Sequence, residues 1–137
     1  MESFTWGETQ SVSPIESGKS KQASVSMRDL EITAALSSAS PLLMSFCAAG
    51  KPLKAATLVY VKTAGTTSKV FLTIELTDVY ISNYDLSGNS GTDGDDVPRD
   101  RFSLRFGKIE FRFTGDKADS SPGKNTTGSW DLRTGLA

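Results

Sequence analysis

The side chains that could do chemistry in this 137-residue sequence are few and poorly spaced for catalysis. Histidine, which is the commonest general base and a common metal ligand, is absent from the composition. The single cysteine, Cys47, lies among apolar residues with no histidine to activate it, so we expect a buried structural thiol rather than a nucleophile. The composition therefore disfavours an enzyme.

Two further runs contain residues typical of ion or phosphate sites. Asp93, Asp95 and Asp96 lie among glycines, but they lack the spacing and the final glutamate of an EF-hand, so we interpret them as part of a solvated loop. The run 121–124, Ser-Pro-Gly-Lys, lacks the first glycine and the spacing of a phosphate-binding loop. Neither run predicts a metal or nucleotide site, and we expect no cofactor.

Paired carboxylates and a basic track are the remaining possibilities. Pairing of Glu75 with Asp78, or of Glu110 with Asp131, fits no recognised two-carboxylate spacing, so surface charge is the simpler interpretation. Four basic residues also follow one stretch of chain: Arg101, Arg105, Lys108 and Arg112. Glu110 interrupts this series, which weakens the case for a nucleic-acid track.

The overall charge, the hydropathy and the cysteine content limit the partners and the compartment that we expect. The chain has 15 basic and 16 acidic residues, a net charge of -1, so bulk electrostatics favour neither nucleic acid nor an anionic membrane as partner. No apolar run approaches the roughly 20 residues that span a bilayer, and the start, Met-Glu-Ser, does not resemble a signal peptide. One cysteine cannot form an internal disulfide, which favours a reducing compartment.

A single helix is predicted at about residues 41–49. Ser40 is a suitable N-cap, Pro41 suits the first helical position and Gly50 suits a left-handed C-cap. Between these residues only Ser45 is polar. We therefore expect a helix that is covered on most of its surface and packs against a sheet.

Alternating apolar and polar residues predict antiparallel β-strands over most of the remaining chain. The predicted strands cover residues 3–7, 23–32, 56–61, 70–76, 79–81, 102–113 and 130–132. The alternation slips near Arg28 and at Gly107, and a bulge would explain each slip. Long polar loops are expected at 10–21, 85–100 and 114–128. The sequence thus predicts one mainly β domain over residues 1–137, with six or seven strands in an antiparallel barrel or two packed sheets.

The turn residues at 64–67 predict that the strands 56–61 and 70–76 form a hairpin. The second face of this hairpin is unusually apolar. Val59, Val61 and Phe71 lie on the side that would face solvent. A solvated face does not need this much apolar surface, so we expect part of it to meet another subunit.

The ordered set of motifs resembles the haemolysin-coregulated protein (Hcp) family, which forms the tube of type VI secretion systems. The segments that carry the resemblance are Ser3–Gly7, Met27–Leu30, Ser40–Met44 with Gly50, Leu76–Ser82, Phe102–Phe106 and Gly128–Leu132. They extend over nearly the whole chain. Family members typically begin with an additional strand and turn before the first of these segments, and this sequence lacks them.

The resemblance implies a compact β-barrel flanked by the helix, with six copies forming a ring and rings stacking into a tube. Its implied role is structural, in assembly and in carriage of small effector proteins within the lumen. The implied partners are further copies, a spike protein and a contractile sheath, with no nucleic acid and no membrane insertion. It also implies a bacterial cytoplasmic protein that is exported to the extracellular space or a target cell without a signal peptide.

The resemblance also assigns roles to residues. The candidates for the lumen and for effector contact are Thr5, Ser24, Ser26 and Arg28. The core and motif residues are Phe4, Trp6, Pro41, Leu43 and Trp130. Two alternatives stay open: a phage-type tail tube protein of another contractile injection machine, and a secreted effector domain in which the acidic loop 85–100 is the only metal-dependent element.

Overall fold

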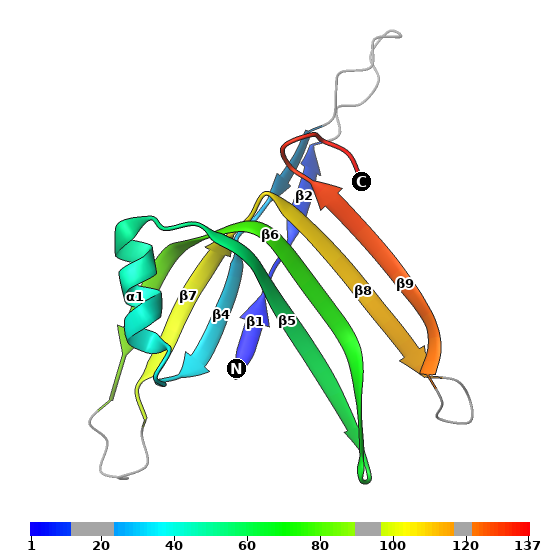
Figure 1. Cartoon of the computed structure of the whole chain (residues 1–137), viewed down its shortest axis with the longest axis horizontal. Coiled ribbons are helices and arrows are strands. Elements are labelled where there is room, and N and C mark those ends of the chain that lie inside the picture. Colours follow the sequence, from blue (N-terminus) through cyan, green and yellow to red (C-terminus); the bar gives the residue numbers. More distant parts are fainter. Residues whose placement is uncertain (12–23, 90–96, 117–121) are drawn as a thin grey trace, which may run out of the picture. The chain divides into compact units, whose positions relative to one another are not determined.

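The computed structural model describes residues 1–11, 24–89, 97–116 and 122–137, and these residues form one helix and nine strands (Figure 1). The helix α1 spans Ser40–Ala49. The strands are β1 (Ser3–Thr5), β2 (Glu8–Ser11), β3 (Ser24–Met27), β4 (Leu30–Ala35), β5 (Leu53–Ala64), β6 (Thr67–Ser87), β7 (Arg99–Arg105), β8 (Lys108–Asp116) and β9 (Pro122–Asp131). The prediction of a mainly antiparallel β fold with two sheets and one helix is confirmed.

The chain forms two compact units. The first unit comprises Met1–Lys51 and Ile81–Arg105, and the second comprises Pro52–Tyr80 and Phe106–Ala137. Strand β6 is long enough to contribute its first part to the second unit and its last part to the first. The two units are therefore described one at a time.

In the first unit, β1 pairs with β4 and β4 pairs with β7, which is followed by β6 in the strand order. The register places Ile32 between Phe4 and Phe102, and it places Leu30 opposite Leu104. Leu30 and Leu104 are buried. Residues that are directly opposite in an antiparallel ladder share a face, so this row forms the apolar side of the sheet.

Strands β2 and β3 form a separate two-stranded sheet. The predicted continuous strand 23–32 is therefore wrong, because its first part pairs with β2 and its second part pairs with β1 and β7. Arg28 and Asp29 lie between the two strands. The slip in alternation there reflects a change of sheet rather than a bulge in one strand.

In the second unit, β5, β6, β8 and β9 are neighbours in that order. One cross-strand row contains Leu58, Ile74 and Phe111, and the next contains Leu76, Ile109 and Trp130. The buried apolar residues of this unit are Leu58, Ile74, Leu76, Val79, Phe106 and Ile109. The predicted β5–β6 hairpin is confirmed, and Gly65 adopts the left-handed conformation that its turn requires.

The loop predictions were too long. β6 continues to Ser87 and β7 begins at Arg99, so only the middle of the predicted loop 85–100 lies between strands. Most of the predicted loop 114–128 belongs to β8 and to the ten-residue β9. β9 is polar on both faces from Lys124 to Ser129, so this part lacks the alternation on which the prediction depended. Residues 12–21 of the first predicted loop lie outside the described residues, and Ser11 ends β2.

Helix α1 has the predicted bounds but not the predicted environment. Pro41 lies in its first turn and Gly50 ends it with a φ of 59°. Ser40 is not its N-cap, because the Ser40 Oγ accepts a hydrogen bond from the Ser37 amide, which precedes the helix. Leu42 and Met44 are 59% and 50% exposed, so the prediction of a mostly covered helix is wrong. A single stripe of a short helix can face a sheet, and apolar residues lie on every side of this one.

Within the described part of the chain, no helix combines the length and the hydropathy needed to cross a membrane.

Candidate functional site

One face of the first unit's sheet is polar across three adjacent strands. The row Thr5, Glu31, Ser103 crosses β1, β4 and β7, and a second row lies beside it. We call this surface the polar face, and it consists of Ser3, Thr5, Glu31, Thr33, Arg101 and Ser103. The side chains alternate with the apolar row of the same strands, so their position on one face follows from the strand period of two.

Ion pairs lie on and beside the polar face. Arg101 is 4.0 Å from Glu31 and 3.6 Å from Asp85 between nitrogen and oxygen atoms, and Arg99 Nε is 2.9 Å from Glu2. A further pair joins Arg105 and Asp29 at 3.4 Å. Apart from the half-buried Asp29, these side chains are exposed, so each pair adds little to stability. Their effect is a hydrophilic surface on which positive and negative charges nearly balance.

A buried polar cluster ties α1 to the sheet of the same unit. Asp100 is 1% exposed and Ser40 is 2% exposed. The hydroxyl groups of Ser40 and Tyr84 both donate to the Asp100 carboxylate, with a Tyr84 Oη to Asp100 Oδ1 distance of 2.6 Å. The hydrogen bond to Asp100 raises the pKa of the Tyr84 phenol. The cluster fixes the first residue of α1 against β7 and β6.

The sequence-predicted lumen residues lie in two different sheets. Thr5 is exposed on the polar face, whereas Ser24 and Ser26 lie on β3 in the two-stranded sheet. Ser26 and Arg28 are also exposed. The Arg28 amide donates to the Gly7 carbonyl at 3.0 Å, and the Arg28 guanidinium occupies the space that a Cβ at Gly7 would need. A side chain at position 7 would therefore displace the guanidinium.

The predicted core and motif residues are less buried than expected. Phe4, Trp6 and Leu43 are half-buried, and Pro41 is exposed. Trp130 is half-buried on β9, directly opposite Ile109. These residues border the cores of their own units rather than fill them.

The predicted acid and base candidates are not arranged for catalysis. Glu75 lies directly opposite Glu110 across the β6–β8 ladder, and Asp131 lies opposite Lys108. Cys47 is half-buried on α1. No group of three or more potential metal ligands occurs among the described residues, and the acidic run 93–96 lies outside them.

Sequence reasoning missed a cluster around the end of β9. Arg133 donates to the carboxylates of Asp131 and Asp78, with a 3.0 Å distance to Asp131 Oδ2. The hydrogen bonds from Arg133 lower the pKa of Asp131 to about 2. Asp78 has a φ of 54°, and the Gly107 amide donates to the Thr77 carbonyl at 2.9 Å. Gly107 was predicted to be a bulge in one strand over 102–113, and this is wrong, because it lies between β7 and β8. It leaves room for the Arg133 side chain, whose Cδ would be 3.3 Å from a Cβ there.

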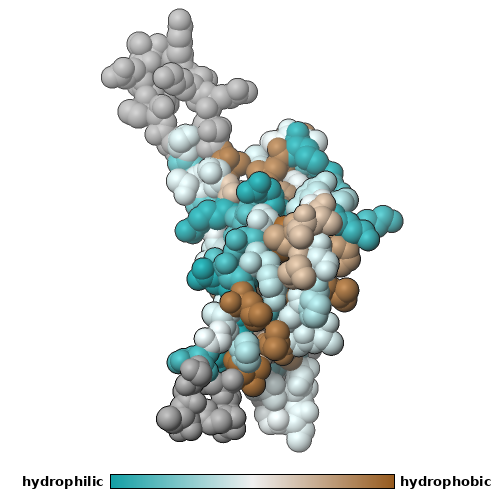
Figure 2. Space-filling model, turned by 90° about the vertical axis from the view of Figure 1, so that its left-hand side faces the viewer, coloured by the Kyte–Doolittle hydropathy of each residue, from teal (hydrophilic) through white to brown (hydrophobic). Residues whose placement is uncertain are grey.

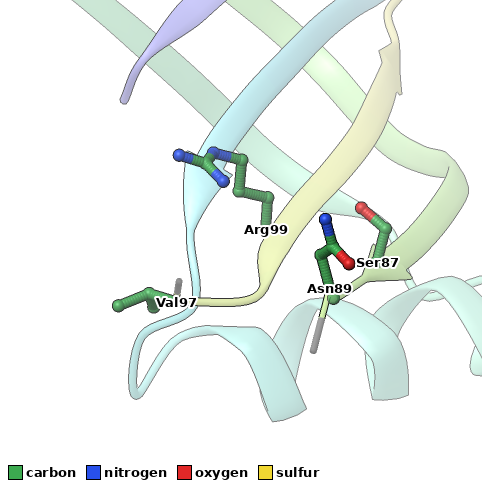
Figure 3. Close-up of a pocket in the computed structure, with 5 residues that line it drawn as sticks. Ser87, Asn89, Val97 and Arg99 are labelled. Carbon is green, nitrogen blue, oxygen red and sulfur yellow. The ribbon is translucent and has the colours of Figure 1, made fainter. Parts of the chain in front are cut away.

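A small cavity of about 140 Å³ lies between the end of β6 and the start of β7. Figure 3 shows Ser87 and Asn89 on one side of it and Val97 and Arg99 on the other. The charged group in this lining, Arg99, is already paired with Glu2. Among the described lining residues, Ser87 has a hydroxyl group, and no carboxylate or histidine lies there to act as its base.

Exposed apolar side chains are the other surface feature of the molecule. Figure 2 shows them over the side on which α1 lies, beside hydrophilic neighbours. In the second unit, Tyr60 and Phe113 are exposed, and the Phe71 ring lies 5.7 Å from the Tyr60 ring and 5.6 Å from the Phe113 ring between centroids. Such surfaces typically mark contacts with other proteins.

Comparison with known families gives a match over most of the chain. The family described as "Type VI secretion system effector, Hcp" matches residues 1–113. Among proteins with curated descriptions, none matches this sequence.

Solved structures also resemble the chain. A structure described as that of a type six secretion system protein has a TM-score of 0.81 at 23% identity, covering 97% of this chain and 82% of its own. Hcp1 from Salmonella typhimurium has a TM-score of 0.73 at 23% identity, covering 98% of this chain and 81% of its own. A type VI secretion system effector from Yersinia pestis has a TM-score of 0.65 at 27% identity, covering 93% and 80%. The fold of this chain is therefore the one that these proteins share.

Proposed function

Because this chain belongs to the Hcp family of type VI secretion system proteins, we propose that it is a structural subunit of the tube of such a system. In this proposal six copies form a ring, rings stack, and the lumen carries effector proteins that are exported with the tube. The single observation that carries the proposal is the family match over residues 1–113. Glu75 lies opposite Glu110, which is paired with Arg112. Cys47 is a half-buried free thiol in a sequence without histidine, and these arrangements support a structural rather than an enzymatic role.

We assign the polar face to the wall of the lumen. Thr5, Glu31 and Ser103 present hydroxyl and carboxylate groups in one row, and the ion pairs of Arg101 leave little net charge. A wall with this chemistry stays hydrated and holds a passing protein weakly. Ser24, Ser26 and Arg28 would extend this lining from the two-stranded sheet.

The proposal also sets the location and the partners. The protein would assemble in the bacterial cytoplasm and reach the extracellular space or a target cell with the tube, without a signal peptide. Its partners would be further copies, the spike protein, the contractile sheath and small effectors. Nucleic acid, membrane insertion and a cofactor have no part in this role.

The test is the mass of the protein in solution, measured by light scattering over a range of concentrations. Six copies of 14.7 kDa give about 88 kDa, and electron microscopy should show rings of that mass. A monomer at every concentration would overturn the proposal.

The assignment of the polar face has its own test. Arg101→Glu should leave the ring mass unchanged, because a lumen residue lies away from the contacts between subunits. A loss of rings in this variant would place the polar face at a subunit contact instead.

A further inference from the structure

The end of the β5–β6 hairpin extends beyond the third strand of its sheet. Among the described residues, β8 pairs with β6 only from Leu72 to Thr77, whereas β5 pairs with β6 as far as the Ala64–Thr67 turn. We call residues Val61–Phe71 the arm. A two-stranded hairpin is marginally stable in water by itself, so the arm has little intrinsic support.

The arm and the residues at its base expose apolar side chains on both faces. Val61 and Val70 oppose each other across the ladder, and they are 46% and 49% exposed. On the other face, Tyr60 and Phe113 are 47% and 46% exposed. A solvated hairpin needs apolar side chains on at most one face, so this pattern is typical of an element that enters a contact on both sides.

An extra residue in β6 brings the aromatic side chains together. Tyr60 opposes Leu72 and Val61 opposes Val70, so Phe71 is the bulged residue of the ladder. The Phe71 ring contacts both the Tyr60 and the Phe113 rings. Clustered aromatic residues at the centre of a surface are typical of residues that dominate a protein interface.

The charge of the arm indicates what covers it. The arm contains Lys62 and Lys69 and no carboxylate. Removing these two residues from the chain's 15 basic residues leaves 13 against 16 acidic residues, a net charge of -3 for the rest of the chain. A contact between two arms would bring like charges together, whereas the rest of the chain has a net negative charge that complements the arm.

We propose that the arm docks on a second copy of this chain, in a head-to-tail contact with a surface other than that copy's arm. Head-to-tail contacts generate closed rings when the rotation closes, so this inference rests on the proposed ring and names the element that builds it. Apolar contacts supply the affinity, and they come from Val61, Val70 and the rings of Tyr60, Phe71 and Phe113. Lys62 and Lys69 set the orientation.

The test compares two arm variants with a matched control by light scattering. The double variant Val61→Thr/Val70→Thr replaces two methyl groups by hydroxyl groups and keeps β-branched side chains that suit a strand. It should raise the concentration for half-assembly by about tenfold or more. The control Val97→Thr makes the same change at an exposed valine outside the arm and should shift that concentration by less than about twofold.

A second variant, Lys62→Glu, tests the charge argument at an exposed position of the arm. It should also weaken assembly, and circular dichroism should show an unchanged fold. If both arm variants form rings at the same concentrations as the wild-type protein, this inference is overturned and the proposed tube role is left intact. A wild-type protein that stays monomeric would overturn both.

Discussion

The two compact units of this protein are stabilised by different means. In the second unit, two cross-strand rows contain four buried apolar residues of the described chain, Leu58, Ile74, Leu76 and Ile109. In the first unit, the buried residues include the polar pair Ser40 and Asp100, and these are the buried polar residues of the described chain. Apolar rows supply most of the free energy of burial, whereas a buried hydrogen-bonded carboxylate fixes one arrangement of the elements around it.

The contacts in the two units also differ in sequence separation. The β5–β6 ladder joins residues that follow each other around a short turn. The Ser40 hydroxyl reaches a carboxylate 60 positions away in the chain. The β5–β6 hairpin of the second unit therefore follows from local pattern, whereas the β6–β8 ladder of that unit and the Ser40–Asp100 hydrogen bond of the first unit join distant segments.

The largest expected effect is on the apolar rows. Ile74 is fully buried, so Ile74→Ala should lower the free energy of unfolding by about 3–4 kcal/mol through lost burial and a residual cavity. Chemical denaturation measures this change, and hydrogen exchange should show the loss of protection in β5, β6 and β8. Val59→Ala, at an exposed position of the same sheet, is the control and should cost much less. A similar cost for the two variants would contradict the view that the rows stabilise this unit.

A smaller but localised effect is expected in the first unit. Asp100→Ala leaves two hydroxyl donors without their acceptor, and it should cost about 2–4 kcal/mol. Hydrogen exchange should show the loss at α1 and β7. Asp85→Ala removes an exposed carboxylate from the same unit and should change stability by less than about 0.5 kcal/mol. If Asp100→Ala leaves the exchange of α1 unchanged, the buried cluster does not hold the helix.

The smallest effect concerns pH at the end of the second unit. The pKa of Asp131 is about 2 in the folded protein and about 4 in an unfolded chain. A folded-state pKa below the unfolded value gives a contribution that is complete above about pH 4 and is lost as the pH falls toward 2. Arg133→Ala should return this pKa toward its ordinary value, as measured by NMR titration of the Asp131 carboxyl.

Lys124→Ala is the control for that titration, because it removes an exposed cation from the same strand, β9. It should leave the Asp131 pKa near 2. An unchanged pKa in Arg133→Ala would instead assign the shift to the backbone hydrogen bonds of the turn.

The sequence predicted those parts of the fold that depend on local pattern. The helix between Pro41 and Gly50 and the β5–β6 hairpin follow from caps, turn residues and alternation. β9 was missed because a strand such as Asn125–Ser129, polar on both faces, has no alternation and forms through its ladder with β8. The change of sheet at Arg28 and Asp29 could not be distinguished from a bulge, because either one interrupts the alternation at this point.

In the candidate site, too, local pattern predicts some features, whereas others depend on contacts between distant segments. Exposure of Thr5 followed from its alternation with Phe4 and Trp6. The buried role of Asp100 could not be predicted, because that residue lies in an acidic stretch that resembles a solvated loop. Its burial depends on Ser40 and Tyr84, and no local pattern connects these residues.

The bulge at Phe71 has an evolutionary consequence. Because Tyr60 opposes Leu72 and Val61 opposes Val70, Phe71 is supernumerary in the ladder. Loss of this one codon would leave every other residue of β5 and β6 on its present face. A lineage can therefore change the aromatic content of this surface through chain length as well as substitution, while the register of the buried rows is inherited unchanged.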